Sequence, residues 1–124
     1  MLEAYSTNVD VAVDTAIPFN NIAIKKGCTA ELSGDSTIIL NKCGVYMVSV
    51  DASASASATI QLYKNGIAQI QAQGTGTNPD FTTLVQVSKN NSCCPCSSPA
   101  TLQVMNTGAE ATFTNVKIVV TKIV

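Results

Sequence analysis

The sequence predicts an all-β fold, an antiparallel β-sandwich of the jelly-roll kind. Apolar residues recur in short runs separated by turn-forming residues, and in no window do they recur at helical spacing. We expect roughly nine or ten short strands without crossover helices, which is typical of an antiparallel sandwich or jelly roll. The chain has 124 residues, 46% of them hydrophobic, which is enough for one domain with its own core.

The first strands are predicted from alternation and from the residues that end each run. Val9, Val11 and Val13 alternate with polar or small residues, and Pro18 ends this run before a second strand over residues 19–24. We assign residues 1–16 to an N-terminal arm or first strand. Residues 17–124 form a single jelly-roll domain in this interpretation.

A hairpin is predicted around the turn-rich residues 33–36. Pairing Leu32 with Ile38, and Ala30 with Leu40, matches the apolar faces of its two strands and places Cys28 opposite Lys42. A symmetric register that places Cys28 nearly opposite Cys43 is the alternative. We favour the first register, which leaves two buried apolar cysteines.

The middle of the chain contains the strongest β-forming run of the first half, residues 45–50. The alternating Ala/Ser segment 51–58 follows, and it is either a flexible linker or an extended strand packed closely against another backbone. We favour the extended strand.

The next hairpin can be given a register by argument. A two-residue turn at Asn65-Gly66 would place Leu62 and Ile60 opposite glutamines. A three-residue loop over residues 64–66, with Gly66 left-handed, instead pairs Leu62 with Ala68, Ile60 with Ile70, and Ala58 with Ala72. We therefore predict the three-residue loop. Beyond it we expect loops at 74–79 and 89–99, and strands at 81–87, 101–105, 111–113 and 116–124.

An immunoglobulin-type sandwich is the main rival fold. The chain has no Trp, so a bridge between Cys43 and Cys93 would lack the aromatic side chain that packs on the core disulfide of such domains. The jelly roll is therefore preferred.

Composition limits the classes of partner. Only 12% of residues are charged, which favours surface buried between subunits. The formal net charge is −1, with no basic stripe to neutralise phosphates, so nucleic-acid binding is disfavoured. We find neither a signal peptide nor a membrane span, and expect a soluble protein made in the cytoplasm with reduced thiols.

Several segments resemble successive strands of the tumour-necrosis-factor-like jelly roll, whose superfamily includes complement globular heads and the C-terminal domain of bacterial collagen-like spore-filament proteins. The resemblance covers roughly residues 17–124 and rests on residues 19–21, 38–40, 44–48, 62–66 and 113–120. It implies a TNF-like fold and a homotrimer, because these domains are typically trimers. It brings no catalytic residues and no cofactor.

A closer likeness is to small proteins encoded by phages and prophages of Gram-positive bacteria, which carry stretches similar to residues 41–46 and 119–122. This likeness implies a structural protein of the virion, assembled in the bacterial host cytoplasm and bound to other phage proteins such as the capsid. There is no collagen-like Gly-X-Y repeat, so a compact capsid decoration or head fibre fits better than a stalked filament. The alternative is a tail or baseplate module that recognises host-surface glycan through loops 74–79 and 89–99. Neither loop carries an aromatic side chain, which tilts us toward decoration.

Catalysis is not expected. The chain has no His, which removes the commonest general base and metal ligand. Its eight acidic residues are scattered; Asp35 and Asp80 fall in turns, and Asp10 and Glu31 fall on solvent-facing strand positions. No Asp-x-Asp spacing supports a calcium site.

Cys93, Cys94 and Cys96 lie within four residues of one another in the loop 89–99. One loop supplies three thiols of the four ligands that zinc needs, so they are weak metal candidates within one chain. Across a threefold axis they could cluster around a metal or form interchain disulfides. The third possibility is free thiols in a loop that packs on a neighbouring subunit, so we place these cysteines at a subunit interface.

The last predicted strand is apolar on two faces. Val116, Ile118 and Val120 lie on one face, and Val119 and Ile123 lie on the other, so both need cover. The second face is covered either by another layer of the same chain or by neighbours around a threefold axis. We favour neighbours, and assign Val116, Ile118 and Val120 to the interface of a homotrimer.

Overall fold

The computed structural model describes residues 1–27, 29–87 and 99–124, and in these ranges every regular element is a β-strand. The all-β prediction is therefore confirmed. The strands are β1 Leu2–Val11, β2 Thr15–Ala16, β3 Asn21–Lys25, β4 Ala30–Ser33, β5 Thr37–Leu40, β6 Gly44–Ala54, β7 Ala58–Lys64, β8 Ile67–Gly76, β9 Asp80–Val87, β10 Ala100–Asn106 and β11 Ala111–Lys122.

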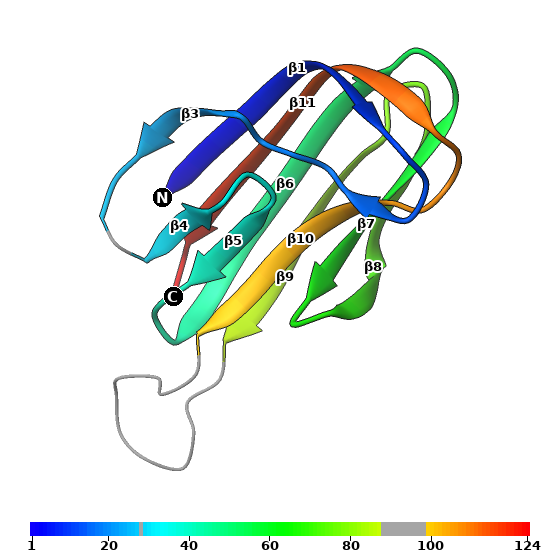
Figure 1. Cartoon of the computed structure of the whole chain (residues 1–124). Helices are drawn as coiled ribbons and strands as arrows, with labels where there is room; N and C mark the ends of the chain where they lie inside the picture. Colours follow the sequence, from blue (N-terminus) through cyan, green and yellow to red (C-terminus); the bar gives the residue numbers. More distant parts are fainter. Residues whose placement is uncertain (28, 88–98) are drawn as a thin grey trace.

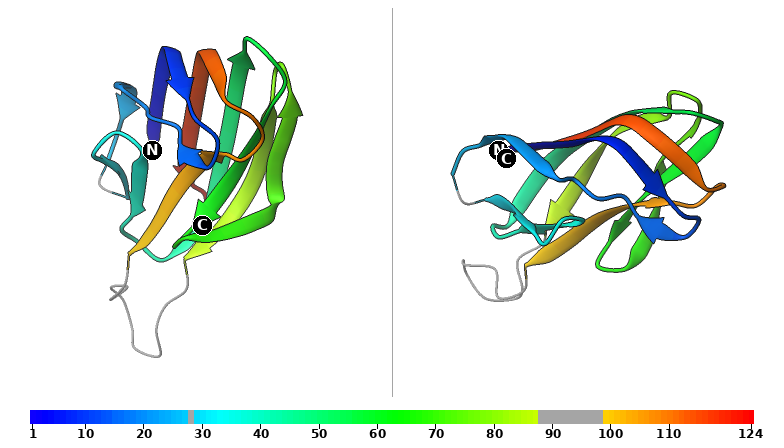
Figure 2. Two further views of the ribbon diagram at one scale, coloured as in Figure 1. Left: turned by 45° about the vertical axis from the view of Figure 1, so that its right-hand side comes forward. Right: turned by 45° about the horizontal axis from the view of Figure 1, so that its top comes forward.

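The strands form two antiparallel sheets that face each other as two layers (Figures 1 and 2). One sheet has five strands in the order β3-β1-β11-β6-β9. The other has the order β4-β5-β10-β7-β8, with β2 paired beside it to β10. Strands far apart in sequence, such as β1 and β11, are neighbours in space, as in a jelly roll.

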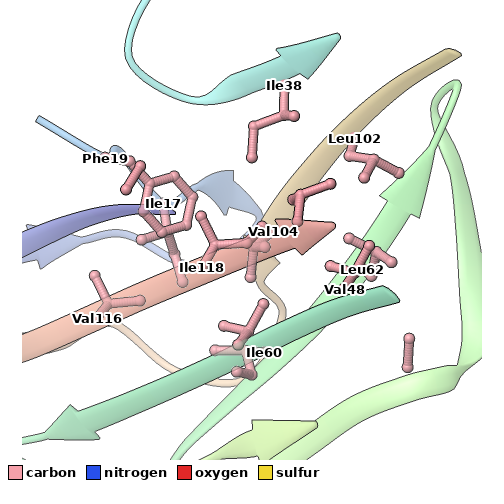
Figure 3. Packing of buried hydrophobic residues seen from close by; sticks show 14 of the residues in the cluster. Ile17, Phe19, Ile38, Val48, Ile60, Leu62, Leu102, Val104, Val116 and Ile118 are labelled. Carbon is pink, nitrogen blue, oxygen red and sulfur yellow. The ribbon is translucent and has the colours of Figure 1, made fainter. Parts of the chain in front are cut away.

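The core lies between the two sheets, because the strands that line it bury alternate residues (Figure 3). On β10, for example, Leu102 and Val104 are fully buried, whereas Gln103 between them is partly exposed. Figure 3 shows side chains from both sheets meeting in this layer, among them Ile17, Phe19, Ile38, Val48, Ile60, Leu62, Leu102, Val104, Val116 and Ile118.

The N-terminal strand β1 lies inside the five-stranded sheet, between β3 and β11. Its Ser6 side chain is fully buried and holds the segment before β3: Ser6 Oγ donates to the carbonyl of Pro18 at 2.8 Å and accepts from the backbone N–H of Asn20 at 2.7 Å. Residues 1–16 therefore contribute a structural strand to the sandwich.

The predicted register of the β4–β5 hairpin is confirmed. Leu32 pairs with Ile38 and Ala30 pairs with Leu40. Ala30, Ile38 and Leu40 are buried, which is the matching of apolar faces that predicted this register.

Several predicted boundaries were wrong. The first strand ends at Val11 and not near Pro18, and the strand predicted at 19–24 is β3, Asn21–Lys25. The two last predicted strands are one strand, β11, whose pairing with β6 shifts between Phe113 and Asn115. β8 continues to Gly76, which reduces the predicted loop 74–79 to residues 77–79. The Ala/Ser segment is neither wholly strand nor linker: β6 extends to Ala54, and residues 55–57 connect it to β7.

Candidate assembly surface

The outward face of the five-stranded sheet carries apolar side chains that the core does not use. On β6, Tyr46, Val48 and Val50 point into the core, so Val45 and Met47 lie on the opposite face. The same alternation places Leu84 of β9 and Val119 of β11 outward, and Leu84 is 57% exposed. We call Val45, Met47, Leu84 and Val119 the sheet-face patch.

The strand register brings the members of the sheet-face patch together. Met47 is paired with Leu84 on one side and with Thr121 on the other. Val119 is paired with Ser49, one outward step along β6 from Met47. Directly opposed side chains have Cβ atoms about 4.5–5.5 Å apart and diagonal neighbours are about 7–8 Å apart, so Leu84 lies directly beside Met47 and Val119 lies diagonally beside it.

A row of polar residues borders this patch on the same face. The register places Tyr5, Lys117, Asp51 and Asp80 in line across β1, β11, β6 and β9. Lys117 is the partner of Asp51, an arrangement of opposite charges that favours strand pairing. The outward face thus has an apolar centre and a charged margin, as many protein interfaces do.

A second exposed apolar surface lies on the β7–β8 hairpin, where Ile67 is 68% and Ile70 is 81% exposed. We call these two residues the hairpin patch. The predicted three-residue loop is wrong, because Lys64 pairs with Ile67 around a two-residue turn in which Asn65 and Gly66 have φ of 52° and 80°. Two such residues with positive φ are typical of a type I′ turn.

The reason for the different register is a bulge in β8. Between the pairs Tyr63↔Ala68 and Gln61↔Gln73, one residue of β7 lies opposite the four residues 69–72 of β8. Ala72 is buried, whereas Ile70 projects to solvent. A regular ladder from the two-residue turn would place glutamines opposite the buried face of β7. The bulge avoids this pairing while the two-residue turn is kept.

The Gln61 side chain holds this bulge. Only 7% of Gln61 is exposed, and its Nε2 donates to the carbonyl of Ala72 at 3.1 Å and to the carbonyl of Gln69. These bonds give partners to two backbone carbonyls within the bulge, where the one-to-one pairing of the ladder is interrupted. The sequence did not reveal this role, because Gln61 reads as an ordinary polar residue of an alternating strand.

The structure does not place the predicted interface residues of β11 at the surface. Val116, Ile118 and Val120 are fully buried between the sheets of one chain. Their predicted common face is correct, but the second layer of the same chain covers it. The apolar residues that this end of the chain presents to solvent include the outward residue Val119, the 49% exposed Ile123 and the 76% exposed Val124.

Cys93, Cys94 and Cys96 lie outside the described residues. Cys43, expected to be a buried apolar thiol, is disulfide-bonded. That expectation came from the hairpin register, which places Cys28 opposite Lys42, and the sequence alone does not give the distances between sulfur atoms that decide pairing. Within the described ranges, no three Cys, Asp or Glu residues are grouped closely enough to hold a metal ion.

The six aromatic side chains do not form a common platform. Phe19, Tyr46, Phe81 and Phe113 are buried. Tyr5 and Tyr63 are partly exposed, but they lie on strands of different sheets. In the part of the chain that the structure describes, there is also no helix with the length and hydropathy to span a membrane.

Comparison with solved structures identifies the architecture. The globular domain of the zebrafish complement 1qA protein superposes with a TM-score of 0.73 at 8% identity, covering 99% of this chain and 96% of that one. The fold is the tumour-necrosis-factor-like jelly roll. PRD1 vertex protein P5 matches this jelly roll with a TM-score of 0.68 at 11% identity over 99% and 96% of the two chains. Murine APRIL matches with a TM-score of 0.64 at 10% identity over 98% of each chain.

These identities are low, so the likeness establishes the fold alone. No family model matches the sequence. No curated protein matches it either. The expected TNF-like jelly roll is thus confirmed by structure.

Proposed function

We propose that the chain is a non-enzymatic, homotrimeric structural protein of a bacteriophage virion, acting as a capsid decoration or head fibre. The observation that carries the proposal is the sheet-face patch, an apolar surface on the outward side of a sheet whose other side already forms the core. A clustered apolar surface with a charged margin is suited to a subunit contact.

A threefold ring needs two different surfaces on each subunit, because its contacts are head-to-tail. We assign the sheet-face patch to one of them and the hairpin patch to the other. β8 and β9 are the adjacent edges of the two sheets, so the hairpin patch follows the sheet-face patch around this side of the sandwich. Each copy can then present its hairpin patch to the sheet-face patch of the next.

The virion is supported by two likenesses. One structure that shares the fold over nearly the whole chain is a phage vertex protein. The stretches 41–46 and 119–122 also resemble small proteins of phages and prophages. Capsid proteins would then be partners of the trimer, and the particle its location.

The alternative function, a tail or baseplate module that binds host-surface glycan, has less support. The loop 77–79 is short, and the exposed parts of Tyr5 and Tyr63 lie on different sheets. Glycan readers usually stack sugars on a shared aromatic surface.

Sedimentation equilibrium of the purified chain at micromolar concentration tests the assembly. We expect three times the 12.9 kDa mass of one chain. A chain that stays monomeric there and on the particle would refute the trimer. Immunogold labelling of phage particles tests the location, and label absent from intact virions would exclude a virion component.

A further inference from the structure

Asn65 and Gly66 form the exposed tip of the β7–β8 hairpin. They are the chain's one Asn-Gly dipeptide. Asn is among the chemically labile residues of proteins, and a following Gly leaves the backbone nitrogen unhindered because it has no Cβ. Nothing lies within 4 Å of the place where a Cβ of Gly66 would stand, so this turn is open to solvent.

Asn65 is nevertheless held by Thr101, the second residue of β10. Its Oδ1 accepts from the backbone N–H of Thr101 at 2.9 Å and from Thr101 Oγ1 at 3.5 Å. Its own backbone N–H donates to the carbonyl of Thr101 at 2.9 Å. The shorter two bonds orient the side chain and the backbone of Asn65 together, and we call this set of contacts the Thr101 clamp.

We propose that Asn65 is a deamidation site whose reaction is held back in the folded chain by the Thr101 clamp. The Gly66 backbone nitrogen attacks Cγ of Asn65, a C–N bond forms, the Cγ–Nδ2 bond breaks, and ammonia leaves with the proton from the Gly66 amide. Water then opens the cyclic imide at either carbonyl, giving aspartate or isoaspartate. The attack requires Asn65 to leave its clamped conformation, so the reaction proceeds through local opening of the turn.

The two products differ in what they do to the hairpin. Aspartate keeps an oxygen acceptor for Thr101, and Asp-Gly also suits a type I′ turn. Isoaspartate adds a methylene to the backbone, which is incompatible with a two-residue turn between Lys64 and Ile67. Both add a negative charge to residues 65–79, a stretch without any charged side chain, beside the hairpin patch.

The test follows modification by peptide mass spectrometry in mildly alkaline buffer, comparing the native chain with the chain in urea. Trypsin cleavage after Lys64 and Lys89 gives peptide 65–89, in which a gain of about 1 Da assigned to Asn65 reports the reaction. We expect this gain in both samples, with a rate at least about tenfold lower in the native chain.

Asn65→Gly is the matched control, since Gly-Gly also suits a type I′ turn but has no side-chain amide to lose. That variant should show no gain at position 65 in either sample. Absence of modification at Asn65 in urea would overturn the site. Equal rates in the native and unfolded chains would overturn the protection by the Thr101 clamp.

Discussion

Met47 on β6 and Leu84 on β9 are cross-strand partners on the outward face of the five-stranded sheet, where Leu84 remains 57% exposed. Their neighbours Tyr46 and Val85 form an inward pair in the core. In this stretch of the β6–β9 pairing, the inward face packs into the core and the outward face carries apolar side chains as well.

Replacing Leu84 by Asp should dissociate the proposed trimer while leaving the sandwich folded, because Leu84 belongs to the sheet-face patch that we assign to the subunit contact and lies outside the core. Sedimentation equilibrium should show a shift from trimer to monomer mass, and circular dichroism should show an unchanged β signature. Ser33→Asp, at the exposed end of the edge strand β4, is the control and should remain trimeric. A trimer that tolerates Leu84→Asp would contradict the assignment of the sheet-face patch.

Gln61→Glu should destabilise the chain by about 3 kcal/mol or more, because it removes the donor to two carbonyls of the bulge and places a charge at a buried position. Its register partner Gln73 is exposed and provides a matched control. Gln73→Glu should change the free energy of unfolding by no more than about 0.5 kcal/mol. Urea denaturation of both variants provides the comparison, and equal midpoints would argue against Gln61 as the residue that holds the bulge.

Ile60 and Ile70 distinguish the observed hairpin register from the register of the predicted three-residue loop. Ile60 is fully buried and Ile70 is 81% exposed, whereas the predicted three-residue loop would pair them on one buried face. Ile60→Ala should cost about 2–5 kcal/mol and Ile70→Ala less than about 0.5 kcal/mol. Both variants are compared by thermal or urea unfolding in the Leu84→Asp background, which we expect to be monomeric. If the two substitutions reduced the free energy of unfolding by similar amounts, the three-residue loop would be the better description of the hairpin.

Tyr46 should make stability fall at alkaline pH. Burial raises the pKa of Tyr46 above its ordinary value of 10.0, and the hydrogen bond from the Lys42 backbone N–H opposes this rise only in part. Below that value both states keep the phenol proton, so the free energy of unfolding is unaffected. Above it the unfolded chain loses the proton first, and stability falls by up to about 1.4 kcal/mol per pH unit until the folded pKa is passed.

The measurement is urea unfolding of the wild type and of Tyr46→Phe across the alkaline range. The variant loses the hydrogen bond from Tyr46 Oη to the carbonyl of Lys42, at 2.8 Å, and should be less stable at neutral pH. Its stability should then decline less steeply above pH 10.0 than that of the wild type. Parallel curves for the two proteins would show that Tyr46 does not contribute to the alkaline loss.

Period-two alternation predicted much of this fold correctly. It identified the register of the β4–β5 hairpin, because an error of one residue there would turn Ile38 and Leu40 out of the core. It also predicted that Val119 and Val120 lie on opposite faces of β11. It could not decide which face meets solvent, since this depends on the second sheet that packs over Val120.

The predictions of strand pairing and strand bounds were wrong where the backbone pairing is irregular. The bulge at residues 69–72 breaks the one-to-one pairing that alternation assumes, so Ile70 was assigned to the core although it is exposed. The continuous β11 was divided at Thr114-Asn115, where the pairing with β6 shifts but the strand continues. The disulfide at Cys43 was missed because pairing depends on distances in three dimensions.

The position of β11 between β1 and β6 governs how the chain can fold. During synthesis β1 and β6 emerge before β11 and can pair with β3 and β9, yet the gap between them is filled only when β11 leaves the ribosome. The five-stranded sheet therefore closes in one late step that joins segments separated by nearly the whole chain, and such non-local pairing is slow. A ribosome stalled before residue 111 would hold a chain with two open strand edges, and that species should be the one most prone to aggregation and to capture by chaperones.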